Sequence, residues 1–298
     1  MQKFILSTDS TCDLYAGFIK ENDIKFVSLT YTVEDKAGNI TDGLDAFTDY
    51  SQYVDFYNML RNGSLSRTSM LNYESHMAHF TALAKEGAED VVHFTISSGL
   101  SPTVTVAEKA AAEVKKSYPE FNVYAIDSLS ATIGQGALVR AALRMRNEGK
   151  TAAETAEYVK ALRFKIQYMI AANDLNYLRR GGRVSSVAAV AGTMLGIKPI
   201  LTFSREGKLV IADKVRGMKR AFALALEKME KYPPSDEHGF FWIVHTDAEE
   251  DAHKLADMVE EKYGRRPDIS IMGPVIGSHV GPGAVAIIWK SDIERNDG

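Results

Sequence analysis

The chain has 298 residues, of which 45% are hydrophobic and 25% are charged, so it is long enough for two domains with apolar cores. A formal net charge of -4 gives no electrostatic footprint for nucleic acid or for an anionic membrane. The single cysteine, Cys12, excludes an intramolecular disulfide bond, and a reducing cytoplasm is the compartment that we expect.

The first half of the sequence alternates short apolar runs with amphipathic stretches. The predicted strands are 4–8, 25–33, 91–96 and 123–126, and the predicted helices are 13–21, 47–60, 73–85, 104–116 and 131–147. Residues 35–43 hold two glycines and an asparagine and are predicted to form a loop. Such alternation is typical of a parallel sheet flanked by helices.

The pattern changes after about residue 149. Thr151, with Glu154 three residues later, forms a capping box that predicts the start of a helix. Strands at 199–203 and 208–212 flank a turn, so the second sheet is at least partly antiparallel. We therefore predict an α/β protein with an N-terminal parallel-sheet α/β sandwich and a C-terminal α/β domain whose sheet is mixed or largely antiparallel. The predicted boundaries are 1–160 and 161–298.

The most apolar stretch runs from residue 184 to 201 and includes small residues, Lys198 and Pro199. These breaks argue against a membrane span. Residues 188–197 are apolar on all sides, which is typical of a buried helix, although small side chains also leave room for a tunnel beside it. Residues 1–6 are followed directly by the polar run STDST at 7–11, so the apolar start is too short for a signal peptide. We expect it to form a buried strand.

Four polar clusters are predicted to lie at the carboxyl ends of strands of the parallel sheet, where its ligands are usually bound. These clusters are 9–11, 68–69, 97–99 and 127–128. The third leads from a strand into a helix, and free amides with serine hydroxyls at such a junction suit a carboxylate or a phosphate. Helix capping by Ser101, ahead of Pro102, is the simpler explanation of the same residues.

A glycine- and proline-rich run at 273–283 surrounds His279 and predicts a fixed backbone path. The imidazole could donate a hydrogen bond to an anion, or it could be a loop histidine bonded to a nearby carbonyl. Residues 177–184 are predicted to form a cationic loop that leads into a helix, and Arg183 or Arg180 could hold a carboxylate or phosphate in a bidentate fork. Ion pairing with a local acid such as Asp174 is the more common use of such residues.

Taken together, the order and spacing of these segments resemble the DegV family, whose members bind fatty acids and serve as binding subunits of bacterial fatty acid kinase. The matching segments are STDSTCDL at 7–14, Thr68-Ser69, ISSGLS at 96–101, AIDS at 125–128, YLRRGGRVSS at 177–186, GIKPIL at 196–201 and HVGPGAVA at 279–286. The resemblance spans nearly the whole chain and implies two α/β domains with an acyl chain between or within them.

The resemblance also implies the residues that bind the carboxylate. The implied contacts are the hydroxyls of Thr68 and Ser98, the backbone of Gly99, His279 nearby, Ser69 as a further candidate, and Arg183 facing either the carboxylate or a partner. This chain has SGLSPT where the family usually has SGLSGT, so Pro102 occupies the first helical position. The change removes one amide but keeps the helix start, so we expect binding to be retained.

The implied function is to bind a long-chain fatty acid of the palmitate or oleate class without catalysing a reaction. The tail would be buried, and the carboxylate would be presented to a dihydroxyacetone-kinase-like catalytic subunit that forms an acyl phosphate, or the protein would act in lipid transport. The sequence lacks GxxxxGK[ST] and paired carboxylates for magnesium, so we expect neither a cofactor nor a metal. A cytoplasmic location with peripheral membrane contact is compatible with this role.

Alternative functions have weaker support in the sequence. A serine hydrolase would use Ser98 as nucleophile, His279 as base and Asp9 or Asp127 to orient it, but no G-x-S-x-G elbow occurs. A fluorophosphonate probe that labelled Ser98 stoichiometrically would favour this alternative.

Two further functions were considered: nucleotide binding by glycine-rich loops and metal binding by histidines. A phosphate- or nucleotide-binding enzyme would need dinucleotide spacing, which the glycines at 134–136 and 281–283 lack. A metal site would need a third ligand beside His76 and His79, and we expect these two to be surface histidines.

Overall fold

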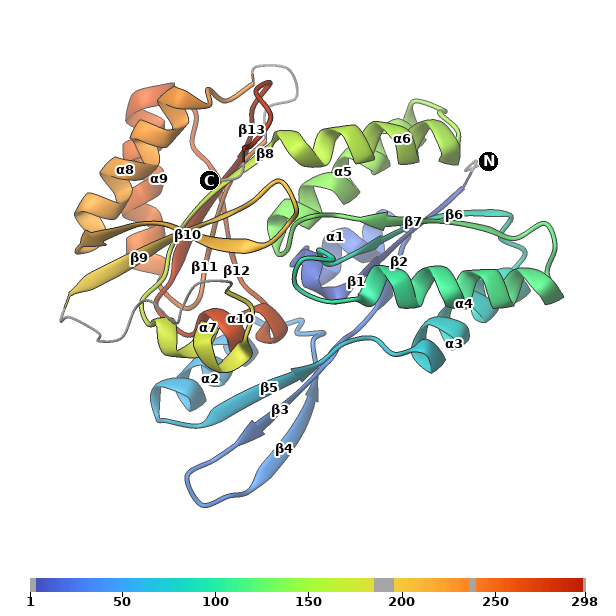
Figure 1. The fold of residues 1–298 in the computed structure, drawn as a ribbon, viewed down its shortest axis with the longest axis horizontal. Helices are drawn as coiled ribbons and strands as arrows, with labels where there is room; N and C mark the ends of the chain where they lie inside the picture. The colour runs from blue at the N-terminus through green and yellow to red at the C-terminus, as the bar shows by residue number, and fades with distance from the viewer. Residues whose placement is uncertain (1–3, 185–195, 236–239, 297–298) are drawn as a thin grey trace.

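The structure, a computed structural model, describes residues 4–184, 196–235 and 240–296. It contains three β-sheets, and helices pack between and around the two larger ones (Figure 1). Within the described ranges, no helix combines the length and the apolar character needed to cross a bilayer. The apolar segment 188–197 lies almost entirely outside the described residues.

The N-terminal sheet is wholly parallel, as the sequence predicts. Its strands, in the order β2-β1-β6-β7, are Ile24–Val27, Ile5–Asp9, Asp90–Thr95 and Asn122–Asp127. Helices α3 (Tyr73–Lys85) and α4 (Thr103–Ser117) cover one face through a separate apolar cluster. The other face packs against α5 (Ile133–Asn147) and α6 (Ala152–Leu162).

A small antiparallel sheet interrupts the N-terminal half and projects from it (Figure 1). Its strands are β3 (Thr30–Glu34), β4 (Ile40–Leu44) and β5 (Leu65–Ser69), in the order β4-β3-β5, and α2 (Tyr50–Arg61) connects β4 to β5. The single strand predicted at 25–33 is therefore wrong, because the chain leaves one sheet after Val27 and enters another at Thr30.

The loop predicted at 35–43 is also partly wrong, because β4 occupies its second half. The carboxylate of Asp35 accepts hydrogen bonds from the amides of Ala37 and Asn39 and shapes the turn that lets β4 pair with β3. Residues of β4 are mostly exposed, including the apolar Ile40 and Leu44. Pairing with β3 defines this strand, so its own hydrophobic pattern gave no signal.

The C-terminal sheet is mixed and largely antiparallel, which confirms the prediction. Its strands, in the order β10-β9-β8-β13-β11-β12, are Leu209–Arg216, Ile197–Phe203, Ile166–Ala171, Val285–Lys290, Phe241–His245 and Asp268–Ile271. Only β11 and β12 are parallel. The hairpin between β9 and β10 turns at Gly207, whose positive φ of 72° suits a residue without a side chain.

One apolar core joins the two larger sheets. Leu6 and Phe94 of the parallel sheet share this core with Leu201 and Ile288 of the C-terminal sheet, and α5 and α6 lie between the sheets (Figure 1). The opposite face of the C-terminal sheet is covered by α8 (Met218–Lys231) and α9 (Glu249–Tyr263). The boundary proposed at residue 160 falls within α6, just before the C-terminal sheet begins.

The glycine- and proline-rich run forms a helix, α10 (Pro274–Val280), so the interpretation of His279 as a loop residue is wrong. Pro274 occupies the first helical turn, where its missing amide is tolerated. Gly277 is required by close packing, since a Cβ there would overlap the hydroxyl of Tyr57. Helix α7 (Leu175–Gly181) packs beside α10.

Candidate functional site

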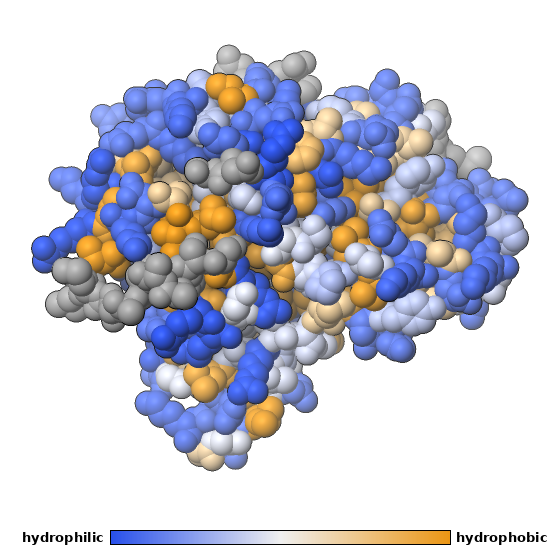
Figure 2. Space-filling view, viewed as in Figure 1, coloured by the Kyte–Doolittle hydropathy of each residue, from blue (hydrophilic) through white to orange (hydrophobic). Residues whose placement is uncertain are grey.

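A cavity lies where the three sheets approach one another. It holds about 770 Å³ of space free of protein atoms, part of it open to solvent. In the space-filling view, hydrophilic residues cover most of the outer surface, whereas orange and pale residues gather where the halves of the molecule meet (Figure 2).

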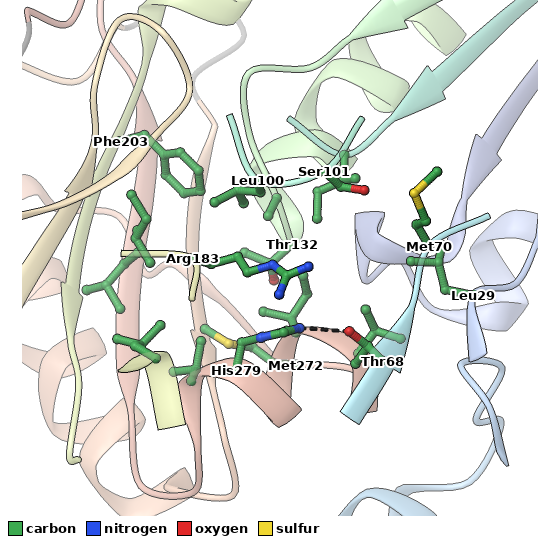
Figure 3. Close-up of a pocket in the computed structure, with 18 residues that line it drawn as sticks. Leu29, Thr68, Met70, Leu100, Ser101, Thr132, Arg183, Phe203, Met272 and His279 are labelled. Atoms are coloured by element: carbon green, nitrogen blue, oxygen red, sulfur yellow. Dashed lines mark hydrogen bonds between the residues drawn. The ribbon is translucent and has the colours of Figure 1, made fainter. Parts of the chain in front are cut away.

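The cavity wall is mostly apolar and is drawn from every part of the fold. The apolar lining residues are Leu29, Met70, Ile96, Leu100, Ala131, Ile170, Leu178, Phe203, Leu209, Met272, Val275, Ile276 and Val280. Phe203 and Leu100 lie on one side of the cavity in the close-up, and Met70 and Leu29 lie on the other (Figure 3). An apolar wall of this kind suits an aliphatic chain, because the chain needs no hydrogen-bond partner and leaves no polar group of the wall unpaired.

Thr68 and His279 form the polar centre of the cavity. The Oγ1 atom of Thr68 lies 2.8 Å from Nε2 of His279, although 211 residues separate them in sequence (Figure 3). Thr68 is placed by the pairing of β5 with β3, where it stands opposite Tyr31. The last turn of α10 presents His279.

His279 is uncharged at neutral pH. Burial and, to a smaller extent, the nearby positive charge of Arg183 together lower its pKa to about 4. Its Nδ1 atom is buried without a hydrogen-bond partner and packs against Gly181. An unpaired buried acceptor is tolerated better than an unpaired N–H, which favours the tautomer with hydrogen on Nε2. In that tautomer Nε2–H donates to Thr68, whose own O–H remains available.

Arg183 supplies positive charge at the cavity. It follows the C-terminal cap of α7, donates to the carbonyl of Gly181 and lies in the close-up between Thr132 and the Thr68–His279 pair (Figure 3). Its side chain is exposed on one side and lines the cavity on the other. Asp174, the acid considered as its partner, instead caps α7 by accepting from the amide of Asn176.

The other sequence-predicted residues do not line the cavity. Ser98 is exposed, and its amide donates to the Asp127 carboxylate at 3.0 Å. The amide of Gly99 donates to Ser97 Oγ at 3.1 Å, and its Cα packs against the turn of the β9–β10 hairpin. The structure therefore brings together Thr68, His279 and Arg183 and leaves Ser98 and Gly99 outside the lining.

Ser69 is exposed and is likewise absent from the lining. It follows Thr68 on β5, and consecutive residues of a strand point to opposite faces. The expectation that this pair follows a strand of the parallel sheet is wrong, because both residues lie within a strand of the small antiparallel sheet.

Two hydroxyl-bearing residues that we had not predicted as ligand contacts line the cavity. The prediction that Ser101 caps the helix is wrong, because α4 begins at Thr103 and its N-cap is Pro102. Ser101 lines the cavity, and its Oγ lies 2.8 Å from the hydroxyl of Thr103. Thr132 precedes α5 with a positive φ of 51°, a conformation that is uncommon for a residue other than glycine. The motif ISSGLS could have pointed to Ser101, but no sequence signal marked Thr132.

Asp9 and Asp127 organise the loops at the edge of the parallel sheet. Burial raises the pKa of Asp9, although its carboxylate accepts hydrogen bonds from the Ile96 amide and from Thr11 and Gln135. Asp127 accepts from the amides of Ser98 and Leu129. These bonds fix the backbone of the loops that border the cavity.

The prediction that His76 and His79 are surface histidines is wrong. His76 is buried, and Ser7 Oγ lies 2.7 Å from His79 Nε2 and 2.9 Å from His93 Nδ1. Burial lowers the pKa of His79 to about 4, so this cluster is uncharged at neutral pH. Among the residues with described positions, no group of three His, Cys, Asp or Glu side chains has an arrangement that could hold a metal ion.

Comparison with known proteins gives matches over almost the whole chain. Residues 3–292 match a family model described as "Uncharacterised protein, DegV family". A DegV domain-containing protein of Clostridium perfringens is 33% identical over 297 residues, which cover 99% of this chain and 100% of that protein.

Solved structures show the same fold. A DegV lipid-binding protein of Thermotoga maritima has a TM-score of 0.83 at 27% identity, with coverage of 98% of this chain and 100% of that chain. A DegV family protein of Thermus thermophilus, described by its fatty acid binding, has a TM-score of 0.81 at 27% identity, with coverage of 97% and 99%. The similarity therefore includes both halves of the molecule.

Proposed function

Since the chain belongs to the DegV family, we propose that it binds one long-chain fatty acid, with the tail in the apolar cavity and the carboxylate at the Thr68–His279 pair. The observation that carries this proposal is the combination of an apolar wall with one polar centre and a cation beside it. The fatty acid and lipid binding of the relatives from Thermus thermophilus and Thermotoga maritima supports the same ligand class.

Burial of the tail provides most of the binding free energy. A C16 chain has about fourteen methylene groups, each contributing ~0.8 kcal/mol, so burial contributes at most ~11 kcal/mol. Ordering the chain and losing its free motion offset several kcal/mol of this gain. The remainder is enough for tight binding, provided that the carboxylate is not left unpaired.

The polar centre satisfies the carboxylate with few groups. With hydrogen on Nε2, His279 donates to Thr68, and the Thr68 hydroxyl donates to a carboxylate oxygen. Arg183 compensates the negative charge from the edge of the cavity. Ser98, Gly99 and Ser69 are proposed contacts on the family resemblance alone. Ser98 and Gly99 would need the loop after β6 to turn inward.

The proposed role is to present the carboxylate rather than to transform it. A dihydroxyacetone-kinase-like catalytic subunit would transfer a phosphoryl group to it and form an acyl phosphate, or the protein would carry the acid between membranes and enzymes. Arg183 supports presentation, because its exposed side chain lies beside the carboxylate site. The proposed setting is cytoplasmic, with peripheral contact to a membrane.

The hydrolase alternative receives no support from the geometry. The Nε2 atom of His279 bonds to Thr68, and Ser98 does not line the cavity. A serine nucleophile needs a base within hydrogen-bond reach, and the described contacts of Ser98 provide none.

We expect oleate to stabilise the protein against heat and ATP to leave it unchanged. Ligand at about 1,000 times its Kd contributes about 4 kcal/mol to the folded state, which corresponds to a rise in Tm of several degrees. A thermal melt with each compound measures this directly, after the protein has been stripped of any lipid. A rise with ATP and none with oleate would favour a nucleotide-binding protein instead.

A further inference from the structure

The carboxyl groups of Asp13 and Asp45 flank Gly273, the residue directly before α10. Asp13 follows the short helix η1 (Ser10–Cys12) and accepts a hydrogen bond from the Gly273 amide at 3.0 Å. Asp45 follows β4 and is only 5% exposed. One oxygen of Asp45 would lie 2.6 Å, and one of Asp13 2.7 Å, from a Cβ built on Gly273, so the two carboxyl groups converge on one point.

The protein around these carboxyl groups satisfies them only in part. The Oδ2 atom of each is buried without a hydrogen-bond partner, and neither residue has an ion pair among the described residues. The titratable groups around them are Asp9 in β1, Cys12 in η1, Lys20 in α1, Tyr31 in β3, and Tyr53 and Tyr57 in α2. Two buried anions without a counter-charge repel each other, and a proton on one removes this repulsion.

The pair is connected to the fatty acid cavity through the backbone. Gly273 is the N-cap of α10, and Met272 and Ile276 on either side of it line the cavity. Thr132 also lines the cavity, and its hydroxyl faces Asp13 without reaching hydrogen-bond geometry. A shift of the Gly273 amide would therefore move the helix that carries His279.

A second hollow gives the pair a route to solvent. This hollow holds about 650 Å³ of atom-free space, part of it open, and both Asp13 and Asp45 line it. Proton exchange with bulk water therefore does not require the fatty acid cavity to open.

We propose that Asp13 and Asp45 share one proton, and that this protonated pair is a positioning element that holds Gly273 and α10 where His279 meets Thr68. The inference rests on the proposed function, because it concerns regulation of the same cavity. Loss of the proton leaves two facing carboxylates, which separate and release the start of α10. Fatty acid affinity therefore falls as the pH rises.

The direction of the pH effect follows from the two titrations. Burial raises the pKa of Asp13 from an ordinary 3.8 to about 7, and burial with the nearby charge of Asp13 raises that of Asp45 well above its ordinary value. The folded protein therefore keeps a proton that the unfolded chain has lost. Its contribution to stability is fully present below about pH 4 and is lost as the pH rises through about 7.

The test is the pH profile of Asp45→Asn, whose amide cannot ionise, read with the fluorescent C18 probe cis-parinaric acid. Between pH 6 and 8.5 the Kd of the wild-type protein is expected to rise roughly fivefold or more, which is the lower end of typical coupling between sites. The Kd of Asp45→Asn should change less than about twofold relative to its value at pH 6. Asp42→Asn is the matched control, because Asp42 is an exposed aspartate of β4, the strand that Asp45 follows.

Ionisation of the probe itself is common to all three proteins, so only the difference between profiles is interpreted. If the Kd rises equally with pH in the wild type and in Asp45→Asn, the proposal of a shared proton is overturned. A wild-type Kd that does not change with pH would overturn it too. Stabilisation of the wild type at pH 8 by Ca²⁺ or Mg²⁺, absent in Asp45→Asn, would also overturn it by placing a cation there. If Asp45→Asn fails to fold, Asp13→Asn takes its place.

Failure of the proposed function would look different. Absence of probe binding at every pH and in every variant would refute fatty acid binding, not the proton. Urea unfolding without ligand then still tests the pair, because the wild type and Asp42→Asn should lose stability between pH 5 and 8 more steeply than Asp45→Asn.

Discussion

Thr68→Val is expected to weaken oleate binding by roughly 10- to 150-fold, because a hydrogen bond to a charged group contributes about 1.5–3 kcal/mol. The substitution keeps the shape of the side chain but removes the hydroxyl that we propose to bind the carboxylate. It also leaves Nε2 of His279 without its partner at 2.8 Å. Titration of lipid-free protein with oleate gives the Kd, and a urea melt shows whether the fold is retained.

Thr41→Val is the control for this prediction. Thr41 is an exposed threonine of β4 in the same small sheet and does not line the cavity, so the same substitution there should leave the Kd unchanged within about twofold. Equal affinity of the wild type and Thr68→Val would show that the carboxylate lies elsewhere. Adding Ser98→Ala to Thr68→Val tests the loop after β6, and a further loss of affinity would place Ser98 on the ligand.

Leu100→Trp is expected to weaken oleate binding by about tenfold or more, because overpacking costs about 1–3 kcal/mol where the space is already needed. Leu100 is half-buried on the loop after β6 and faces the cavity beside Phe203 (Figure 3). An indole at this position would occupy the space of the tail. Decanoate should lose less affinity than oleate, since a shorter chain leaves part of the cavity empty.

Leu100→Met is the control, because it replaces the same residue without a large change of side-chain volume. This variant should bind oleate almost as tightly as the wild type does. The measurement is the ratio of the oleate and decanoate Kd values for each variant. Unchanged affinity of Leu100→Trp for oleate would mean that the tail does not pass Leu100, which would contradict the placement of the acyl chain.

The parts of the fold that the sequence predicts well are those with strong local patterns. The buried parallel strands and the β9–β10 hairpin have continuous apolar runs or a turn with glycine, and these patterns persist in the structure. The small antiparallel sheet was missed because its strands are exposed and short. The break between Val27 and Thr30 carries no glycine or proline to mark it.

The site was harder to predict, because it depends on contacts between distant segments. Thr68 lies in β5 and His279 lies in α10, and only the family resemblance connected them. Ser98 and Gly99 belong to a recognisable local motif, yet the Ser98 amide donates to Asp127 and the Gly99 amide donates to Ser97. The hairpin turn also packs against Gly99. The Asp13–Asp45 pair leaves no trace in sequence spacing, since it is formed by packing around Gly273.

The most direct test of fatty acid binding is denaturing mass spectrometry of the lipid extracted from protein that was purified without added ligand. We expect a co-purifying C14–C18 carboxylic acid at close to one mole per mole of protein. We also expect much less lipid from Leu100→Trp purified in parallel. Repeated recovery of lipid-free wild-type protein that also fails to take up oleate would contradict the proposed function.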